Sequence, residues 1–230
     1  MAIRQRAIQA EDKQERHHAI LDAAERLLMR SPERIANVAE VADEAGLAKG
    51  TVYLYFPGKE ELLLAVHERN VDRFFRALID RLAVDAPARV EDVLALTHAH
   101  MVDRPLFLPL AARCFGAMGQ SVPPEAGFAF KQRMAERLSR AGAGLERHFP
   151  ELTPGDGVAL LRRSYALIIG LWQMSAQSAG AGCPAALAGD PSPVFNFAYP
   201  AELDRALRAL WSGSVGRPLP AAGRSDGGAR

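Results

Sequence analysis

The stretch AGLAKGTVYLYFPGKEEL gathers side chains that suit contact with a polyanion. Lys49 and Lys59 carry positive charge, Thr51 offers a hydroxyl and a methyl group, and Tyr53 and Tyr55 offer phenolic hydroxyls. Such groups bind phosphate oxygens and base edges, and a threonine methyl can contact the methyl group of thymine. We therefore interpret this stretch as a candidate DNA-reading surface.

Two short helices joined by a glycine turn are predicted to position these side chains. Asn37 precedes Val-Ala-Glu in the pattern of a capping box, which predicts the start of the first helix. Gly46 predicts its end, because glycine adopts the left-handed conformation without strain. The second helix is predicted over residues 49–55, and Gly50 near its start would let the backbone approach a partner closely. This arrangement is a helix-turn-helix, whose second helix enters the major groove of DNA.

An earlier helix, predicted over residues 13–30, must complete the core of this unit. Its apolar residues recur at helical spacing and form a single stripe: Ile20, Ala23, Ala24, Leu27 and Leu28. Val52 and Phe56 are expected to pack against this stripe. Core residues and DNA-facing residues therefore share the same short segment.

The stretch VAEVADEAGLAKGTVYLYFPGKEELL resembles the DNA-binding signature of the tetracycline-repressor (TetR) family, over about residues 16–70. The pattern Gly-x-x-Lys-Gly-Thr-x-Tyr-x-Tyr-Phe-x-x-Lys carries the resemblance. Two departures are Ala48, where the family often has a serine or threonine cap, and Leu54, where many relatives carry histidine. On the matching positions, the expected DNA-binding residues are Asn37, Lys49, Gly50, Thr51, Tyr53, Tyr55 and Lys59.

The resemblance also implies an all-helical homodimer that binds a palindromic double-stranded DNA operator. In such regulators a divergent body binds a small molecule, which relieves the repression of nearby genes. No cofactor and no membrane partner are expected. The alternative from the residues alone is a small-molecule carrier or interaction module whose head no longer binds DNA. Two features favour that alternative: the missing cap at Ala48 and a net charge of −2 over residues 1–80, from 12 Lys and Arg against 14 Asp and Glu.

Beyond this unit the sequence predicts helices only. A long linking helix is expected over about residues 59–82, and the predicted body helices lie near 88–102, 104–118, 124–148, 155–179 and 200–212. Thr153 and Pro154 are predicted as the N-cap and first residue of the fourth of these. The expected fold class is all-α with about nine helices. Its parts are a DNA-binding domain at 12–60, a ligand-binding and dimerisation domain at 83–213, and a disordered tail at 214–230.

The body is expected to bind a small, mostly apolar or aromatic effector and to form the dimer. Candidate effector-binding residues are aromatic, sulfur-containing or cationic: Met101, Phe107, Arg113, Phe115, Met118, Phe128, Tyr165 and Trp172. The resemblance implies that the last two helices pair across a two-fold axis. Candidate dimer-interface residues on those helices are Ile168, Ser175, Ala179, Leu203, Leu207, Leu210 and Trp211.

Composition limits the remaining classes of function. The formal net charge of +1 gives no bulk attraction to DNA, so a local patch must act. Two cysteines do not make a disulfide framework, and neither a signal peptide nor a long apolar run is evident, so a cytoplasmic location is expected. His98 and His100 raise the possibility of a metal site, but residues two apart on a helix point in nearly opposite directions. Catalysis has no motif in its favour.

Overall fold

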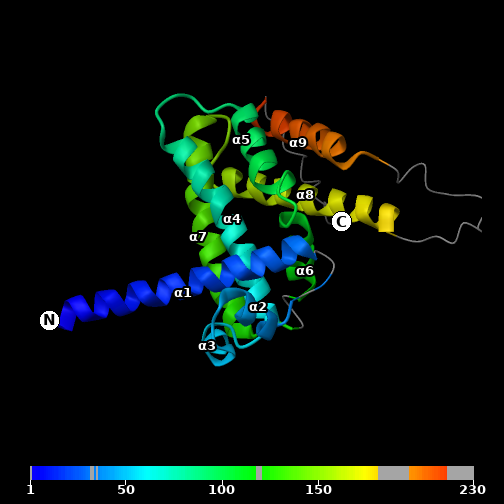
Figure 1. Cartoon of the computed structure of the whole chain (residues 1–230). Coiled ribbons are helices and arrows are strands. Elements are labelled where there is room, and N and C mark those ends of the chain that lie inside the picture. Colours follow the sequence, from blue (N-terminus) through cyan, green and yellow to red (C-terminus); the bar gives the residue numbers. More distant parts are fainter. Residues whose placement is uncertain (1, 32–33, 35, 118–120, 181–196, 217–230) are drawn as a thin grey trace, which may run out of the picture.

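The computed structural model describes residues 2–31, 34, 36–117, 121–180 and 197–216. The helices in this part of the chain are α1 (Ala2–Arg30), α2 (Val38–Ala45), α3 (Lys49–Tyr55), α4 (Lys59–Ala83), α5 (Val90–Thr97), η1 (His98–Val102), α6 (Phe107–Ala117), α7 (Pro124–His148), α8 (Asp156–Gly180) and α9 (Tyr199–Val215). None of the described residues forms a strand, and the all-α prediction is confirmed. Figure 1 shows α1 to α3 at one end of α4 and α5, α8 and α9 toward its other end.

The first three helices and the start of α4 share a small apolar core. Ile20 of α1, Val41 of α2, Val52 of α3 and Val66 of α4 are all completely buried in it. Each of these helices is too short or too polar to be stable alone, so their stability comes from this shared core. The cluster α1–α3 is called the head below.

The predicted signals of α2 are both present. The side-chain oxygen of Asn37 accepts a hydrogen bond from the Glu40 amide at 3.0 Å, and the Asn37 amide donates to the Glu40 carboxylate at 2.9 Å. Gly46 ends the helix with φ 66 and ψ 29, in the left-handed region. By contrast, α3 begins after Ala48, which makes no side-chain capping hydrogen bond. The N-terminus of α3 is therefore less well capped than that of α2.

Helix α4 is shared by both parts of the molecule. It has 25 residues and is therefore about 37 Å long. Leu62 and Val66 pack in the head core, whereas Phe74 and Leu78 pack in the core of the body. Helix α4 thus connects the core of the head with the core of the body.

The body, formed by α5 to α9 with η1, packs around the second half of α4. Helices α7 and α8 of the body cross in close contact, where Gly142 faces Gly157. A Cβ atom placed on Gly157 would lie 2.3 Å from the Gly142 carbonyl oxygen, so the crossing requires glycine there. Among the described helices, none is both long enough and apolar enough to cross a membrane.

Some predicted boundaries are corrected by the structure. Helix α8 begins at Asp156 and not at Pro154, because Gly155 has φ 96 and leaves the helical path. The Thr153 hydroxyl donates to the Asp156 carboxylate at 2.5 Å, whereas the predicted cap would accept a hydrogen bond from a backbone amide. The helix predicted over 88–102 ends in the π-helical turn η1, where the Asp103 amide bonds to the carbonyl five residues back at 2.9 Å.

Candidate DNA-binding surface and internal cavity

Helix α3 carries most of the predicted DNA-facing side chains on the molecular surface. Lys49 and Gly50 are exposed, and Tyr53 has 46% of its surface exposed. Tyr55 differs, because it packs against the head core with its ring 6.2 Å from that of His17, centroid to centroid. Of the two tyrosines, Tyr53 is the better placed to meet a partner from outside.

Packing among the described residues does not explain the glycine at position 50. A Cβ atom added at this position would meet nothing within 4 Å. Glycine inside a helix costs about 1 kcal/mol relative to alanine. Close approach by an external partner would account for a residue that internal packing does not require.

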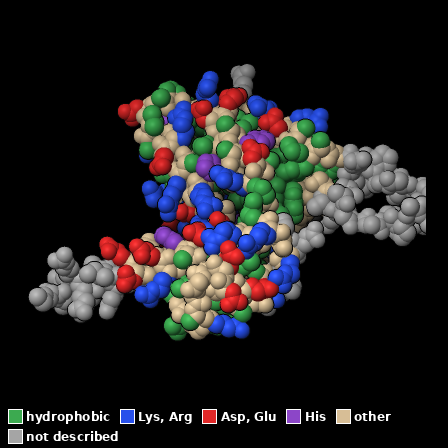
Figure 2. Space-filling view, viewed as in Figure 1, with side chains coloured by type: hydrophobic (Ala, Val, Ile, Leu, Met, Phe, Trp, Pro, Cys, Tyr) green, Lys and Arg blue, Asp and Glu red, His purple; other side chains and the backbone are tan. Residues whose placement is uncertain are grey.

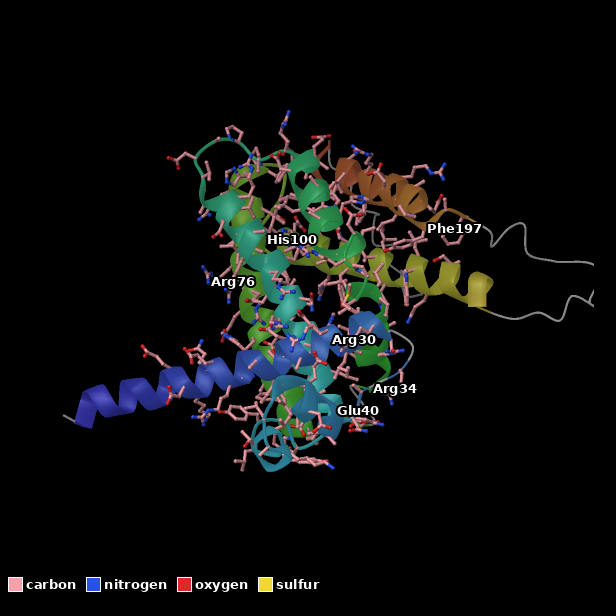
Figure 3. All side chains as sticks on the ribbon, viewed as in Figure 1. Arg30, Arg34, Glu40, Arg76, His100 and Phe197 are labelled. Carbon is pink, nitrogen blue, oxygen red and sulfur yellow. The ribbon has the colours of Figure 1, made fainter. Side chains whose placement is uncertain are left out.

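The acidic side chains of α2 are paired with arginines. Glu44 accepts a hydrogen bond from Arg26 at 2.8 Å and also pairs with Arg30. Glu40 pairs with Arg34, and Figure 3 shows Arg30, Arg34 and Glu40 gathered where α1 meets α2. These arginine hydrogen bonds lower the pKa of both carboxyl groups. These ion pairs therefore neutralise part of the negative charge of the head, at the contact between α1 and α2.

The two cations of the predicted surface differ in their surroundings. Lys49 has no ion-pair partner among the described residues, and the ammonium of Lys59 lies 3.8 Å from Glu60. Figure 2 shows acidic and basic side chains intermixed over the visible face of the molecule. A local set of side chains, and not the bulk charge, must therefore provide any attraction to DNA.

Leu54 stands on the same surface and is the most exposed large apolar residue of the described chain, at 86%. It occupies the position where the sequence departs from the histidine of many TetR proteins. Exposed leucine has no internal packing role, and apolar side chains can contact the methyl group of thymine.

The body encloses a cavity of about 670 Å³. Its walls come from α4 to α9 and η1, and most of the side chains are apolar: Phe74, Phe75, Met101, Phe130, Met134 and Ile169 are examples. A cavity of this size and lining suits a drug-sized apolar molecule. Of the predicted effector-binding residues, Met101 and Tyr165 line it.

The other predicted effector-binding residues lie elsewhere. Those placed off the cavity wall are Phe107, Arg113, Phe128 and Trp172. Phe107 is completely buried in the body core, and Phe128 turns to solvent with 63% of its surface exposed. The side chain of Phe115 and the whole of Met118 fall outside the described residues. Helical periodicity alone does not distinguish side chains that face the cavity from those that face the core or solvent.

The predicted dimer-interface residues mostly face inward. Leu203, Leu207, Trp211 and Ile168 are each no more than 2% exposed. The Trp211 indole donates to the hydroxyl of Ser164 at 3.0 Å, within the same chain. Side chains already buried in their own chain offer no surface to a second copy, so these four assignments are corrected.

The remaining predicted interface residues are Leu210, Ser175 and Ala179. Leu210 and Ser175 are partly exposed, while the side chain of Ala179 falls outside the described residues. The apolar stripe of α9 thus packs in the body core of its own chain.

His67 is a cavity residue that the sequence analysis missed. It lies on the buried stripe of α4, is 2% exposed, and has Nε2 3.3 Å from the hydroxyl of Tyr165. Burial lowers the pKa of His67 to about 4, so the ring is neutral at pH 7. The sequence did carry a signal for this residue, because a histidine stands at a position of α4 where the helical pattern calls for an apolar side chain.

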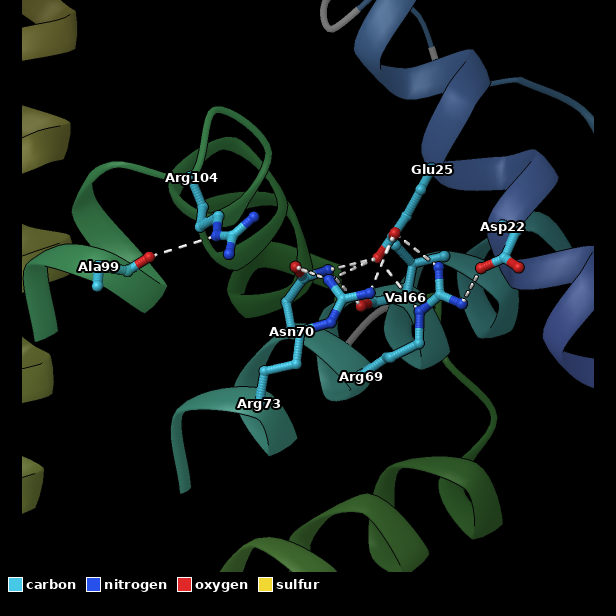
Figure 4. Close-up of polar contacts among 8 residues, drawn as sticks. All are labelled: Asp22, Glu25, Val66, Arg69, Asn70, Arg73, Ala99 and Arg104. Atoms are coloured by element: carbon cyan, nitrogen blue, oxygen red, sulfur yellow. Dashed lines mark hydrogen bonds and ion pairs between the residues drawn. The ribbon is translucent and has the colours of Figure 1, made fainter. Parts of the chain in front are cut away.

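A polar cluster on the other side of α4 joins this helix to the head (Figure 4). Glu25 of α1 accepts hydrogen bonds from Arg69 at 3.2 Å, Asn70 at 3.0 Å and Arg73 at 3.4 Å, and Asp22 accepts one from Arg69 at 2.6 Å. These five residues are called the Glu25 cluster below. The three donors, Arg69, Asn70 and Arg73, lie on the segment of α4 that also carries cavity-lining residues.

The metal hypothesis gains no support. Among the described residues there is no group of three or more His, Cys, Asp or Glu side chains that could hold a metal ion. His98 instead lies 3.8 Å from Asp204 of α9. Burial raises the pKa of the Cys114 thiol to about 12, which makes this cysteine a weak nucleophile.

Comparisons with known proteins agree with this architecture. A segment of 85 residues is 27% identical to the fatty acid metabolism regulator protein of Bacillus subtilis (strain 168), covering 37% of this chain and 44% of that protein. A segment of 64 residues is 41% identical to the HTH-type transcriptional regulator EthR of Mycobacterium tuberculosis, covering 28% of this chain and 30% of EthR. The chain therefore spans less than half of either relative.

Solved structures share the fold over most of the chain. SmeT, the repressor of the Stenotrophomonas maltophilia multidrug efflux pump SmeDEF, superposes with a TM-score of 0.50 at 23% identity, covering 88% of this chain and 96% of SmeT. SCO7518 of Streptomyces coelicolor A3(2) gives a TM-score of 0.50 at 22% identity, over 85% and 98% of the two chains.

Family matches divide the chain where the structure changes from head to body. Residues 20–66 match the family described as bacterial regulatory proteins, tetR family. Residues 68–218 match the family described as tetracyclin repressor-like, C-terminal domain. The chain belongs to the TetR family of transcriptional regulators.

Proposed function

We propose that the chain is a dimeric repressor that binds a palindromic DNA operator through α3 and releases it when a small, mostly apolar molecule fills the body cavity. The proposed DNA-binding residues are those predicted from the sequence, with Lys49, Gly50, Thr51 and Tyr53 foremost because they stand on the outer surface of α3. Asn37, Tyr55 and Lys59 complete the set at its edges.

The observation that carries this proposal is the double use of α4. One side of its middle segment supplies His67, Val71 and Phe74 to the cavity wall. Another side of the same segment supplies Arg69 and Arg73 to the Glu25 cluster, which holds α1. An occupant that presses on the cavity wall would therefore move the helix that positions the head.

The spacing of two heads makes such a movement consequential. Two recognition helices must meet successive major grooves, about 34–36 Å apart along the DNA. A molecule that binds more tightly to a dimer with a different spacing shifts the population away from the DNA-binding form. The regulatory response then follows from the difference in affinity between the two forms.

The test is binding of the purified protein to fluorescent DNA fragments tiled over the region upstream of its gene, across a salt series. We expect selective binding to one fragment, with affinity falling steeply as salt increases. Lys49→Ala should weaken binding and reduce the slope of log affinity against log salt by about 2, because the dimer loses one cation from each of its two α3 helices. Arg140→Ala, which removes an exposed cation of the body, is the matched control and should leave the slope unchanged.

A correctly folded Lys49→Ala protein that binds the same fragment as tightly as wild type would contradict the assignment of α3. Absence of selective binding to every fragment, by a folded protein, would instead favour the small-molecule carrier. Tyr53→Phe is expected to show a smaller loss, because it removes one hydroxyl and no charge.

A further inference from the structure

The cavity wall contains a buried polar group whose hydrogen bonding is incomplete. His67 contacts Tyr165 through Nε2, but its Nδ1 atom has no hydrogen-bond partner among the described residues. The other buried polar side chains of the wall do have partners. Thr97 donates to the Val93 carbonyl at 2.8 Å, and Ser164 accepts from the Trp211 indole at 3.0 Å. Leaving a buried polar atom without a partner is unfavourable, so an occupant that supplies one gains affinity.

Resting on the proposed function, we propose that the cavity binds a neutral, largely apolar molecule that carries a hydroxyl or carbonyl oxygen, and that this oxygen pairs with the ring of His67. The apolar lining supplies most of the affinity by removing the hydrocarbon part of the molecule from water. The oxygen supplies orientation, as a small number of polar groups do in most ligand cavities.

The position of the hydrogen on the His67 ring decides which oxygen groups can bond to Nδ1. A neutral imidazole carries hydrogen on only one nitrogen. When Tyr165 donates to Nε2, Nδ1 carries that hydrogen and needs an acceptor, which a carbonyl or a hydroxyl provides. When Nε2 donates to Tyr165, Nδ1 needs a donor, which only the hydroxyl provides. A hydroxyl therefore suits both arrangements.

The electrostatics of the cavity favour an uncharged molecule. The His67 ring is neutral at pH 7 because burial lowers its pKa to about 4. A carboxylate beside it would lose its hydration without gaining an opposite charge. Lys131 and Arg162 also contribute to the wall, but both are exposed. Water already solvates these two charges, and pairing with an exposed cation gains little.

Four compounds with the same flexible chain test this inference: dodecane, 2-dodecanol, 2-dodecanone and dodecanoate. Binding to the DNA-free protein is measured by calorimetry and by tryptophan fluorescence, to which Trp211 of the cavity wall contributes. For 2-dodecanol and 2-dodecanone, the affinity is divided by that of dodecane in the same protein. This affinity ratio is then compared between wild type and His67→Leu, because the comparison cancels the different hydration of the compounds. We expect His67→Leu to weaken 2-dodecanol about fivefold relative to dodecane.

Tyr199→Phe is the matched control. It removes a hydroxyl that donates to the Ile168 carbonyl at 3.0 Å and that does not line the cavity, so the ratio should stay at its wild-type value. An unchanged ratio in His67→Leu would overturn the contact with His67. Dodecanoate binding tenfold or more tightly than 2-dodecanol would overturn the neutral class, as would failure of all four compounds to bind.

A measurement on the wild-type protein covers the case in which His67→Leu does not fold. In protein labelled with nitrogen-15 at histidine, 2-dodecanol should shift the resonance of one non-titrating ring and dodecane should not. Identical spectra with both compounds would overturn the proposal. Since DNA is absent from these experiments, their failure leaves operator binding untouched, and failure to bind DNA leaves their result standing.

Discussion

The head and the body handle polar side chains in opposite ways. On α3 Lys49 and Tyr53 are exposed, and Lys49 has no ion-pair partner among the described residues. In the body, by contrast, the buried polar residues are almost all bonded within the chain, as Ser164 and Thr97 are. Gly50 of the head and Gly157 of the body show the same contrast between an open and a packed environment. A Cβ atom on Gly50 would meet open space, whereas one on Gly157 would strike the backbone of α7.

This contrast separates a surface from an interior. The head leaves Lys49 without an ion-pair partner among the described residues and exposes Lys49 and Tyr53, which suits a large and charged partner. The body contains a mostly apolar cavity and leaves Nδ1 of His67 without a partner among the described residues, which suits a small and largely apolar molecule. Changes in the body should therefore act mainly through stability and packing, and changes on α3 mainly through binding.

The largest expected effect tests the tightness of the body. Gly157→Ala places a methyl group 2.3 Å from the Gly142 carbonyl oxygen, so α7 and α8 must separate. We expect the free energy of unfolding to fall by about 3 kcal/mol, measured by urea denaturation. Gly170→Ala on the same helix is the control, because its methyl group would meet nothing within 4 Å. Equal stability of the two variants would show that the crossing can relax.

The next effect depends on pH and concerns His67. Its pKa is about 4 in the folded protein and 6.5 in the unfolded chain, so the unfolded chain binds the proton more tightly. Stability is therefore lost as pH falls below about 6.5, by about 2 kcal/mol between pH 7.5 and pH 5. His67→Leu should remove this part of the pH dependence. Denaturation curves at both pH values measure it, and parallel losses in the two proteins would contradict the prediction.

The same contrast explains what the sequence could and could not reveal. The head was predicted down to single residues, since Asn37, Gly46 and the range of α3 follow from local rules of capping and turns. The cavity was not, because its wall collects residues from most helices of the chain. Phe128 and Trp211 show the difficulty: one turns to solvent and the other into the core, and helical spacing alone does not distinguish them.

A smaller effect is expected where the two regions meet. Glu25→Ala removes the acceptor for Arg69, Asn70 and Arg73, and the first two of these donors are largely buried. We expect a loss of about 1.5 kcal/mol in the free energy of unfolding, seen also as faster hydrogen exchange in α1. Glu15→Ala, which alters an exposed residue of α1 with no ion pair among the described residues, is the control.

If the Glu25 cluster also couples the cavity to the head, operator affinity should respond less to a cavity ligand in Glu25→Ala than in wild type. The Glu15→Ala control should respond as wild type does. An undiminished response in a Glu25→Ala protein with the expected loss of stability would confine the cluster to a structural role.

The smallest effect concerns the uncapped start of α3. Ala48 has φ −63 and ψ 139, the extended conformation that capping residues adopt, but it offers no side-chain acceptor. Ala48→Ser should supply that acceptor to an amide of the first turn and raise the free energy of unfolding by about 1 kcal/mol. Ala95→Ser, at an exposed position inside α5, is the control and should be neutral or slightly destabilising. Because the head keeps its partner-binding groups exposed while relying on a small core, ordering α3 in advance should also tighten DNA binding modestly. A more stable Ala48→Ser protein with unchanged operator affinity would mean that α3 is already fully ordered before DNA arrives.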